Sequence, residues 1–248
     1  GRNSYEWLAE IVPNTDGIRV LDLACGSGPL LKILYDRNKN FRLKGVDMCP
    51  EELALAKARL PDGVVDLFEL KAQNLTAIDD NSIDVVLCHW ALTLMNPITP
   101  VLDEVNRVLS SGGRFAALVD GPMKAAPKYS DVHNLIYRFV QAKIPKYGEI
   151  DLGDPRIRST DRSKNLLHEA FPDAKVNIET SVVSMEGPVA EVAETAAGFF
   201  YASLILPPDT HRIMLSELSN LLVISKQSGN IERQGRFSMP INRLVITK

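Results

Sequence analysis

The stretch VLDLACGSGPLL, residues 20–31, decides the fold of this chain. It opens with an apolar run broken by Asp22, which is typical of a buried strand, and Pro29 suits the first position of a helix. A tight turn from Gly26 to Gly28 joins the two. Glycine is needed in such a turn where a ligand comes close to the backbone, because a Cβ atom would collide with it. The stretch therefore predicts a strand, a ligand-binding turn and a helix.

A carboxylate in the next predicted strand narrows the choice of ligand. Asp47 lies near the end of residues 42–48, 19 residues after Gly28, where an acidic residue can bind both hydroxyls of an adenosine ribose. A dinucleotide fingerprint requires a third glycine, and Leu31 stands in its place. Asp22, before the turn, would repel a pyrophosphate but would attract a cationic ammonium group. The pattern therefore favours S-adenosylmethionine over a dinucleotide.

Strand and helix patterns alternate on both sides of this unit, which is typical of an α/β fold. The predicted strands are residues 18–25, 42–48, 64–73, 83–89, 114–119, 175–185 and 243–247. The predicted helices are residues 29–36, 51–60 and 161–171, and segments around 101–109, 135–140, 189–200 and 214–222. Gly112-Gly113 is the expected C-cap of the helix around 101–109. We expect a single domain over residues 1–248.

Four segments in the first half of the chain resemble the motifs of class I S-adenosylmethionine-dependent methyltransferases, in particular the group that modifies small molecules. They are VLDLACGSG at 20–28, GVDMCPEELALAKARL at 45–60, NSIDVVLCHWALTLM at 81–95 and VLDEVNRVLSSGGRFAALVD at 101–120. The resemblance implies a Rossmann-like sheet of seven strands, mostly parallel with an antiparallel last strand. Helices would cover both faces, with a helical insertion after the fifth strand. Residues 1–120 would mainly bind the cofactor, and residues 121–248 would supply the substrate-recognition helices and the last two strands.

The resemblance also implies which residues bind S-adenosylmethionine and its product S-adenosylhomocysteine. Asp22, Ala24, Gly26 and Gly28 match the methionine-binding turn, Asp47 matches the ribose acid, Met48 would pack on adenine, and Cys88 lies near the cofactor at the end of the fourth strand. The third motif departs from the common Gly-Asp-Ala pattern, because residues 70–72 read Leu-Lys-Ala. We expect the side-chain amide of Gln73 or Asn74 to bind the adenine amine instead.

Methyl transfer requires orientation of the acceptor and, for some acceptors, a base. His89 directly ends the fourth predicted strand, and an imidazole with the ordinary pKa of about 6.5 can take a proton at neutral pH. It either activates a hydroxyl acceptor or only shapes the pocket, and the second interpretation is favoured. The candidate substrate contacts are Trp90 beside it, Tyr5 on a predicted N-terminal helix and Tyr201 in the apolar segment 196–206.

Composition excludes several classes of protein. The chain has 28 Lys and Arg against 31 Asp and Glu, so it lacks the basic excess of a nucleic-acid-binding protein. Its three cysteines have neither zinc-ligand spacing nor the look of a disulfide framework. Its apolar stretches are too short to span a bilayer. We therefore expect no metal, no nucleic-acid or membrane partner, and a cytoplasmic location.

These observations favour in-line methyl transfer to an oxygen, nitrogen or carbon atom of a small molecule. Two alternatives stay open, a tRNA or protein methyltransferase and a non-catalytic protein that binds S-adenosylmethionine. A partial likeness, around the fourth strand and the helix after it, links the chain to enzymes that methylate malonyl-carrier protein. An enzyme of a quinone pathway or of secondary metabolism is at least as consistent with the sequence. The acceptor, its pathway and the oligomeric state are left open.

Overall fold

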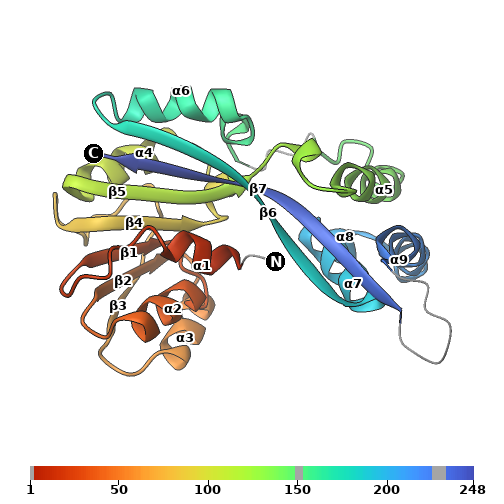
Figure 1. The fold of residues 1–248 in the computed structure, drawn as a ribbon, viewed down its shortest axis with the longest axis horizontal. Helices are drawn as coiled ribbons and strands as arrows, with labels where there is room; N and C mark the ends of the chain where they lie inside the picture. The colour runs from red at the N-terminus through yellow and green to blue at the C-terminus, as the bar shows by residue number, and fades with distance from the viewer. Residues whose placement is uncertain (1–2, 149–152, 225–232) are drawn as a thin grey trace. The chain divides into compact units, whose positions relative to one another are not determined.

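Residues 3–148, 153–224 and 233–248 are described by a computed structural model. They contain a seven-stranded sheet with the strand order β3-β2-β1-β4-β5-β7-β6 (Figure 1). The strands are β1 (Arg19–Leu23), β2 (Arg42–Asp47), β3 (Val65–Glu69), β4 (Ile83–His89), β5 (Leu109–Asp120), β6 (Lys175–Pro188) and β7 (Gln234–Thr247). β1 to β5 pair in parallel and β7 is antiparallel to β5. The predicted Rossmann-like fold with its antiparallel last strand is confirmed.

Among the described residues, one helix precedes the first strand, and the others lie in the connections between strands. The helices are α1 (Ser4–Ala9), α2 (Pro29–Arg37), α3 (Pro50–Arg59), α4 (Thr99–Val108), α5 (Tyr129–Gln141), α6 (Thr160–Ala170), α7 (Val189–Phe199), α8 (Ala202–Ile205) and α9 (Pro208–Leu222). The crossovers from β1 to β3 and from β4 to β5 run in opposite directions along the sheet, so right-handed connections place α2 and α3 on the face opposite α4. α1 packs beside α2, and α4 packs against α6.

Continuous apolar runs in the central strands explain why they are buried. Leu21, Val86 and Ala117 belong to one buried cluster on β1, β4 and β5, which also takes in α4 and α6. A parallel strand covered by helices on both faces must be apolar on both sides. The core therefore lies against the three central strands, whose carboxyl ends share one edge of the sheet.

The described chain divides into two compact units. Residues 3–121, 153–180 and 241–248 form the sheet unit, and residues 122–148, 181–224 and 233–240 form the helical unit. β6 and β7 continue from one unit into the other. In the helical unit, α9 packs against α5 and α7. The expected single domain and its division of roles at residue 120 stay predictions.

Several predicted boundaries are wrong. The last strand begins at Gln234 and not at 243, the fifth at Leu109 and not at 114, and the third ends at Glu69 and not at 73. The expected C-cap at Gly112-Gly113 is also wrong. α4 ends at Val108 and its C-cap is Leu109, so Gly112-Gly113 does not cap this helix. Leu109 is already extended and opens β5, whose pairing with β4 shifts register between Ile83 and Val85. Gly112 has a φ of +75° and its N–H donates to the Lys248 carbonyl (2.9 Å). The left-handed conformation of Gly112 therefore belongs to the irregular start of β5, where its pairing with β4 shifts register.

Candidate functional site

The carboxyl edge of the sheet is where the predicted cofactor residues meet. β1 and β4 are neighbours, yet the chain continues from β1 toward β2 on one side and from β4 toward β5 on the other. In open α/β sheets the loops diverge at such a point and leave a crevice for a ligand. Strand register places Asp22 beside both Gly45 and Leu87. The ends of β1, β2 and β4 therefore share this edge.

The turn after β1 has the backbone conformation that its sequence predicts. Gly26 and Gly28 have φ angles of +50° and +74°, and Ala24 is also left-handed at +57°. A Cβ atom on Gly28 would lie 3.1 Å from the Cβ of Ala56 on α3, so this glycine is also required for helix packing. At Gly26 the nearest atom would be a Glu52 carboxylate oxygen at 3.5 Å. The turn stays open for a ligand at Gly26.

Asp47 ties the ends of β1 and β2 together. Its Oδ2 accepts a hydrogen bond from the Gly26 N–H (2.8 Å), and its Oδ1 accepts one from the Cys49 N–H (2.9 Å). Each carboxylate oxygen can accept a second hydrogen bond. The side chain is therefore held in place while keeping acceptor capacity for two ribose hydroxyls.

Asp22 has an unusual position for a charged residue. It is 1% exposed, and among the described residues neither of its carboxylate oxygens has a hydrogen-bond partner. Burial, with a smaller contribution from the nearby Asp47, raises the pKa of Asp22 well above its ordinary value. A buried carboxyl without a partner is costly, and a cationic ligand group would relieve that cost. The residues at this edge thus fit S-adenosylmethionine, whose ammonium group would meet Asp22 and whose ribose would meet Asp47.

The remaining predicted cofactor contacts lie in different environments. Met48 is 65% exposed immediately after Asp47, so its side chain is free to pack on a ligand. Cys88 is fully buried in the apolar core cluster, and burial raises the pKa of its thiol to about 12. Gln73 and Asn74 lie in the turn region after β3, where the Asn74 N–H donates to the Lys71 carbonyl (2.9 Å). The predicted contact of either amide with adenine stays a prediction.

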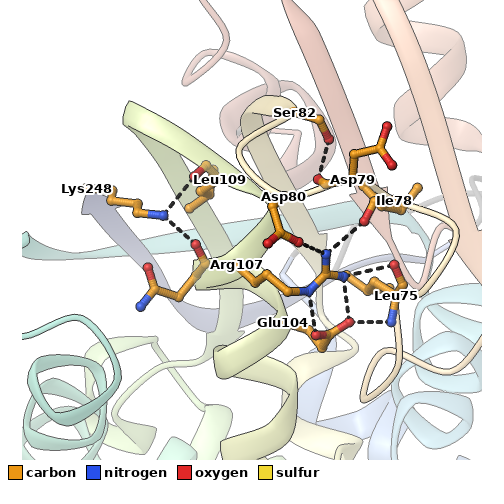
Figure 2. A network of polar contacts seen from close by, with 10 residues as sticks. Leu75, Ile78, Asp79, Asp80, Ser82, Glu104, Arg107, Leu109 and Lys248 are labelled. Atoms are coloured by element: carbon orange, nitrogen blue, oxygen red, sulfur yellow. Dashed lines mark hydrogen bonds and ion pairs between the residues drawn. The ribbon is translucent and has the colours of Figure 1, made fainter.

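Figure 2 shows a clamp formed by Glu104 and Arg107 of α4, which holds the segment after β3. Arg107 donates to the carbonyls of Leu75 (3.0 Å) and Ile78 (2.9 Å), and Glu104 accepts the Leu75 N–H (2.6 Å). The two side chains also pair with each other at 2.8 Å. This pairing lowers the pKa of Glu104 and raises that of Arg107. The clamp ends one residue after Asn74, so it fixes the segment that carries the expected adenine contacts.

His89 and the N-terminal helix meet at the end of β4. The Tyr5 ring stacks on the imidazole with centroids 3.6 Å apart, and Ser4 Oγ lies 3.0 Å from His89 Nε2. Desolvation lowers the pKa of His89 to about 4 and raises that of Tyr5. The imidazole is therefore neutral at pH 7. Of its two predicted roles, shaping the site fits these contacts better, and a role as base stays a prediction.

Arg243 of β7 anchors the same N-terminal helix. It is 8% exposed, donates to the Trp7 carbonyl (2.6 Å) and to Glu179 Oε2 on β6 (2.6 Å), and lies 4.5 Å from the centroid of the Trp7 ring. A buried guanidinium needs such partners to offset its desolvation. The anchor holds α1 on the sheet and so keeps Tyr5 on His89.

Asp120 is a residue at this edge that sequence reasoning missed. It ends β5, and one of its carboxylate oxygens accepts a hydrogen bond from the Trp90 indole N–H (3.1 Å). The signal available in the sequence was its place at the end of the fifth strand. Tyr201 belongs to the helical unit, where it is 45% exposed with a φ of +55°. Its predicted role as a substrate contact stays a prediction.

Among residues 3–148, 153–224 and 233–248, no cluster of three or more His, Cys, Asp or Glu side chains is arranged to hold a metal ion. In the same ranges, no helix combines the length and apolar character needed to cross a membrane.

Residues 21–117 match the family model for a methyltransferase domain. The mitochondrial 2-methoxy-6-polyprenyl-1,4-benzoquinol methylase of Schizosaccharomyces pombe is 29% identical over 180 residues, which is 65% of this chain and 55% of that protein. The demethylmenaquinone methyltransferase of Thermus thermophilus is 28% identical over 138 residues, 55% of this chain and 60% of that protein. The crystal structure of the YcgJ protein from Bacillus subtilis superposes with a TM-score of 0.65 at 17% identity, covering 99% of this chain and 97% of that one.

The family match over residues 21–117, together with the fold and the turn at residues 22–28, supports a class I S-adenosylmethionine-dependent methyltransferase domain. The chain spans just over half the length of the two curated relatives. The structural likeness at 17% identity bears on the fold alone.

Proposed function

We propose that this protein binds S-adenosylmethionine at the carboxyl ends of β1 and β2 and transfers its methyl group to a small-molecule acceptor. The observation that carries the proposal is the buried, unpartnered carboxylate of Asp22 behind a left-handed glycine turn. A fold that only needed a buried strand would place an apolar residue there, as at its neighbours Leu21 and Leu23. The carboxylate is best explained by a cationic ligand.

The residues of the chain would each perform a simple task. Asp22 neutralises the ammonium group, Asp47 receives the ribose hydroxyls while bracing the turn, and Met48 covers the adenine. When bound, S-adenosylmethionine supplies a methyl group already activated by its positive sulfonium. The protein then has to orient the acceptor, exclude water and, for a protic acceptor, receive or relay a proton.

The small-molecule acceptor is supported by the relatives and by charge. The two curated relatives are named as methylases of quinone-ring compounds. The net charge of −3 disfavours a nucleic-acid substrate, because phosphate neutralisation dominates such complexes. A tRNA methyltransferase would be revealed by retention on heparin that weakens steeply with salt.

Calorimetric titration with S-adenosylhomocysteine tests the proposal. We expect the protein to bind this product, and we expect Asp22→Asn and Asp47→Ala each to weaken the binding by about tenfold or more, since each loses a charge-assisted contact. Asp66→Asn is the matched control, because it removes the same charge from an exposed ion pair with Lys44 on β2. Its affinity should stay within about twofold of the unmodified protein.

Circular dichroism of each variant establishes that it is folded before the titration is interpreted. The proposal is overturned if the unmodified protein does not bind S-adenosylhomocysteine, or if Asp47→Ala binds it as well as the parent. Binding without turnover on any small-molecule acceptor would favour the non-catalytic alternative.

A further inference from the structure

Trp90 adopts a strained conformation at the end of β4. Its φ is +60°, in the left-handed region that bulky side chains rarely occupy. Such strain persists only where surrounding contacts enforce it, and it is common at functional sites. The Trp90 N–H donates to the Leu118 carbonyl (3.1 Å), and the indole N–H donates to Asp120 Oδ1 (3.1 Å). The strained backbone thus directs the indole onto one particular carboxylate.

Asp120 has a free acceptor position beside this contact. Its side chain is only partly buried, and among the described residues its second carboxylate oxygen has no hydrogen-bond partner. If the contact served only to join two strand ends, a single neutral acceptor for the indole N–H would be enough. A partly exposed carboxylate, with a charge and a second oxygen, is more than that contact needs. The pair therefore orients one carboxylate oxygen and leaves the other available.

Trp90 and Asp120 lie on the other side of the point between β1 and β4 where the loops diverge, away from the proposed cofactor residues Asp22 and Asp47. Asp22 and Asp47 are on β1 and β2, whereas Trp90 and Asp120 follow β4 and end β5. Strand register pairs Asp22 with Leu87 and His89 with Leu118. The residue of β5 level with Asp22 is Ala116, two strand spacings of about 4.8 Å away, and Asp120 lies four residues further along β5. At about 3.3 Å per residue, the backbone of Asp120 therefore lies about 16 Å from that of Asp22. That separation suits a second, small molecule beside the cofactor.

We propose that Asp120, oriented by the Trp90 indole, binds the methyl acceptor by accepting a hydrogen bond from its O–H or N–H group. This inference rests on the proposed function. It makes Asp120 a specificity-determining residue, and it names the substrate class as protic acceptors, hydroxyl compounds or amines. The bond would direct a lone pair of the acceptor heteroatom toward the methyl group. A fully substituted ether or amide nitrogen, with no proton to donate, would leave the carboxylate unpartnered and bind poorly.

The test uses the ¹⁵N-labelled 248-residue chain saturated with S-adenosylhomocysteine. The chain has two tryptophans, so Trp90→Phe assigns the indole signal of Trp90 in the ¹H–¹⁵N spectrum. Phenol and methylammonium are titrated as protic probes, and anisole serves as the matched probe without a donor. We expect at least one protic probe to shift the Trp90 indole signal in a saturable manner, and anisole to bind at least about fivefold more weakly.

Asp120→Asn separates ligand binding from strand pairing. Its amide oxygen still accepts the indole hydrogen bond, but the second position becomes a donor and the charge is lost. We expect S-adenosylhomocysteine affinity within about twofold of the parent and loss of the protic-probe response. The inference is overturned if neither protic probe shifts the signal, if anisole matches the better of them, or if Asp120→Asn responds like the parent.

Failure of this inference can be told apart from failure of the proposed function. If S-adenosylhomocysteine does not bind, the proposed function fails with it. If S-adenosylhomocysteine binds in the calorimetric titration while the indole signal of Trp90 ignores both protic probes, only the role of Asp120 is rejected.

Discussion

In the proposed function, Asp22 would serve ligand binding at the expense of the stability of the ligand-free protein. A carboxyl group that is 1% exposed and has no partner among the described residues destabilises the ligand-free fold. The same group becomes favourable once a cation lies beside it. Binding sites commonly carry such a cost, because the groups that recognise a ligand are unsatisfied without it.

This position makes the stability of the ligand-free protein depend on pH. Burial raises the pKa of Asp22 in the folded state, so folding favours the protonated acid. Its best contribution is then present below the unfolded pKa of about 3.9 and is lost as pH rises through the raised folded value. We predict that Asp22→Asn, which cannot ionise, is more stable than the parent at pH 8 by about 1–3 kcal/mol.

Urea unfolding of both proteins without ligand, at pH 8 and at pH 5.5, measures this difference. The advantage of Asp22→Asn should shrink at the lower pH, and saturating S-adenosylhomocysteine should reverse it at pH 8. A parent protein as stable as the variant at pH 8 without ligand would show that Asp22 is not an unpaired buried charge.

His89 illustrates how burial can change the expected chemistry of a side chain. In solution its pKa would let it exchange protons near pH 7, but desolvation lowers that pKa to about 4. Nε2 lies 3.0 Å from the Ser4 hydroxyl and the ring face is covered by Tyr5. A neutral, engaged imidazole is a weak base, which fits a role in shaping the site.

At the scale of elements, the side chains of Glu104 and Arg107 on α4 hold the segment after β3 in place. The Arg107 side chain donates five hydrogen bonds. Two reach the backbone carbonyls of Leu75 and Ile78 and one reaches Asp80, all in this segment, and the other two reach Glu104 on the same helix. The segment has no regular secondary structure of its own over residues 70–82. Its position therefore depends on these contacts.

We predict that Arg107→Met destabilises the protein by about 1–3 kcal/mol, because it leaves the Leu75 and Ile78 carbonyls and Glu104 without their donor. The affinity for S-adenosylhomocysteine should fall about threefold to tenfold under conditions where the variant is fully folded, because the segment carrying Gln73 and Asn74 loses its support. Chemical unfolding and calorimetric titration measure the two effects.

Arg138→Met is the matched control for this prediction, since Arg138 forms an exposed pair with Glu217 in the helical unit. We expect it to change stability by less than about 1 kcal/mol and to leave ligand affinity unchanged. If Arg107→Met is destabilised but binds S-adenosylhomocysteine like the control, the clamp supports the fold without positioning the adenine contacts.

At the scale of the whole molecule, the two units divide the chain unequally in sequence. The sheet unit collects three separate segments, and all of the predicted cofactor residues lie in it, whereas Tyr201 lies in the helical unit. β6 and β7 pass through both. A ligand bound at the sheet edge should therefore protect backbone amides of the sheet unit from hydrogen exchange, and not those of the helical unit.

We predict that S-adenosylhomocysteine slows amide hydrogen exchange in residues 22–28 and 45–49 and leaves α5 and α9 unchanged. The physical reason is that the proposed contacts lie at the ends of β1 and β2, whose turns would be covered by the ligand. Exchange measured by mass spectrometry checks this, with Asp47→Ala as the weakly binding control at the same ligand concentration. Protection confined to the helical unit would contradict the proposed location of the cofactor.

Local patterns in the sequence were sufficient to predict the fold and the glycine turn at residues 26–28. Period and burial are properties of short segments, so the strand at 83–89 is predicted with the bounds that the structure shows. The left-handed glycines and the acidic end of β2 likewise follow from neighbouring residues. The wrong C-cap at Gly112-Gly113 arose because the same glycine pattern suits both a helix end and an irregular strand.

The sequence by itself determined the fold class, the turn at residues 22–28 and the acid at Asp47, because each depends on residues close together in the chain. Only the tertiary structure decided that Asp22 is left without a partner, that Trp90 is strained onto Asp120, and that Arg243 holds the N-terminal helix across 236 positions of sequence. These features depend on desolvation and on contacts between distant segments. No local pattern records either one, since both come into being only when the strands assemble into the sheet.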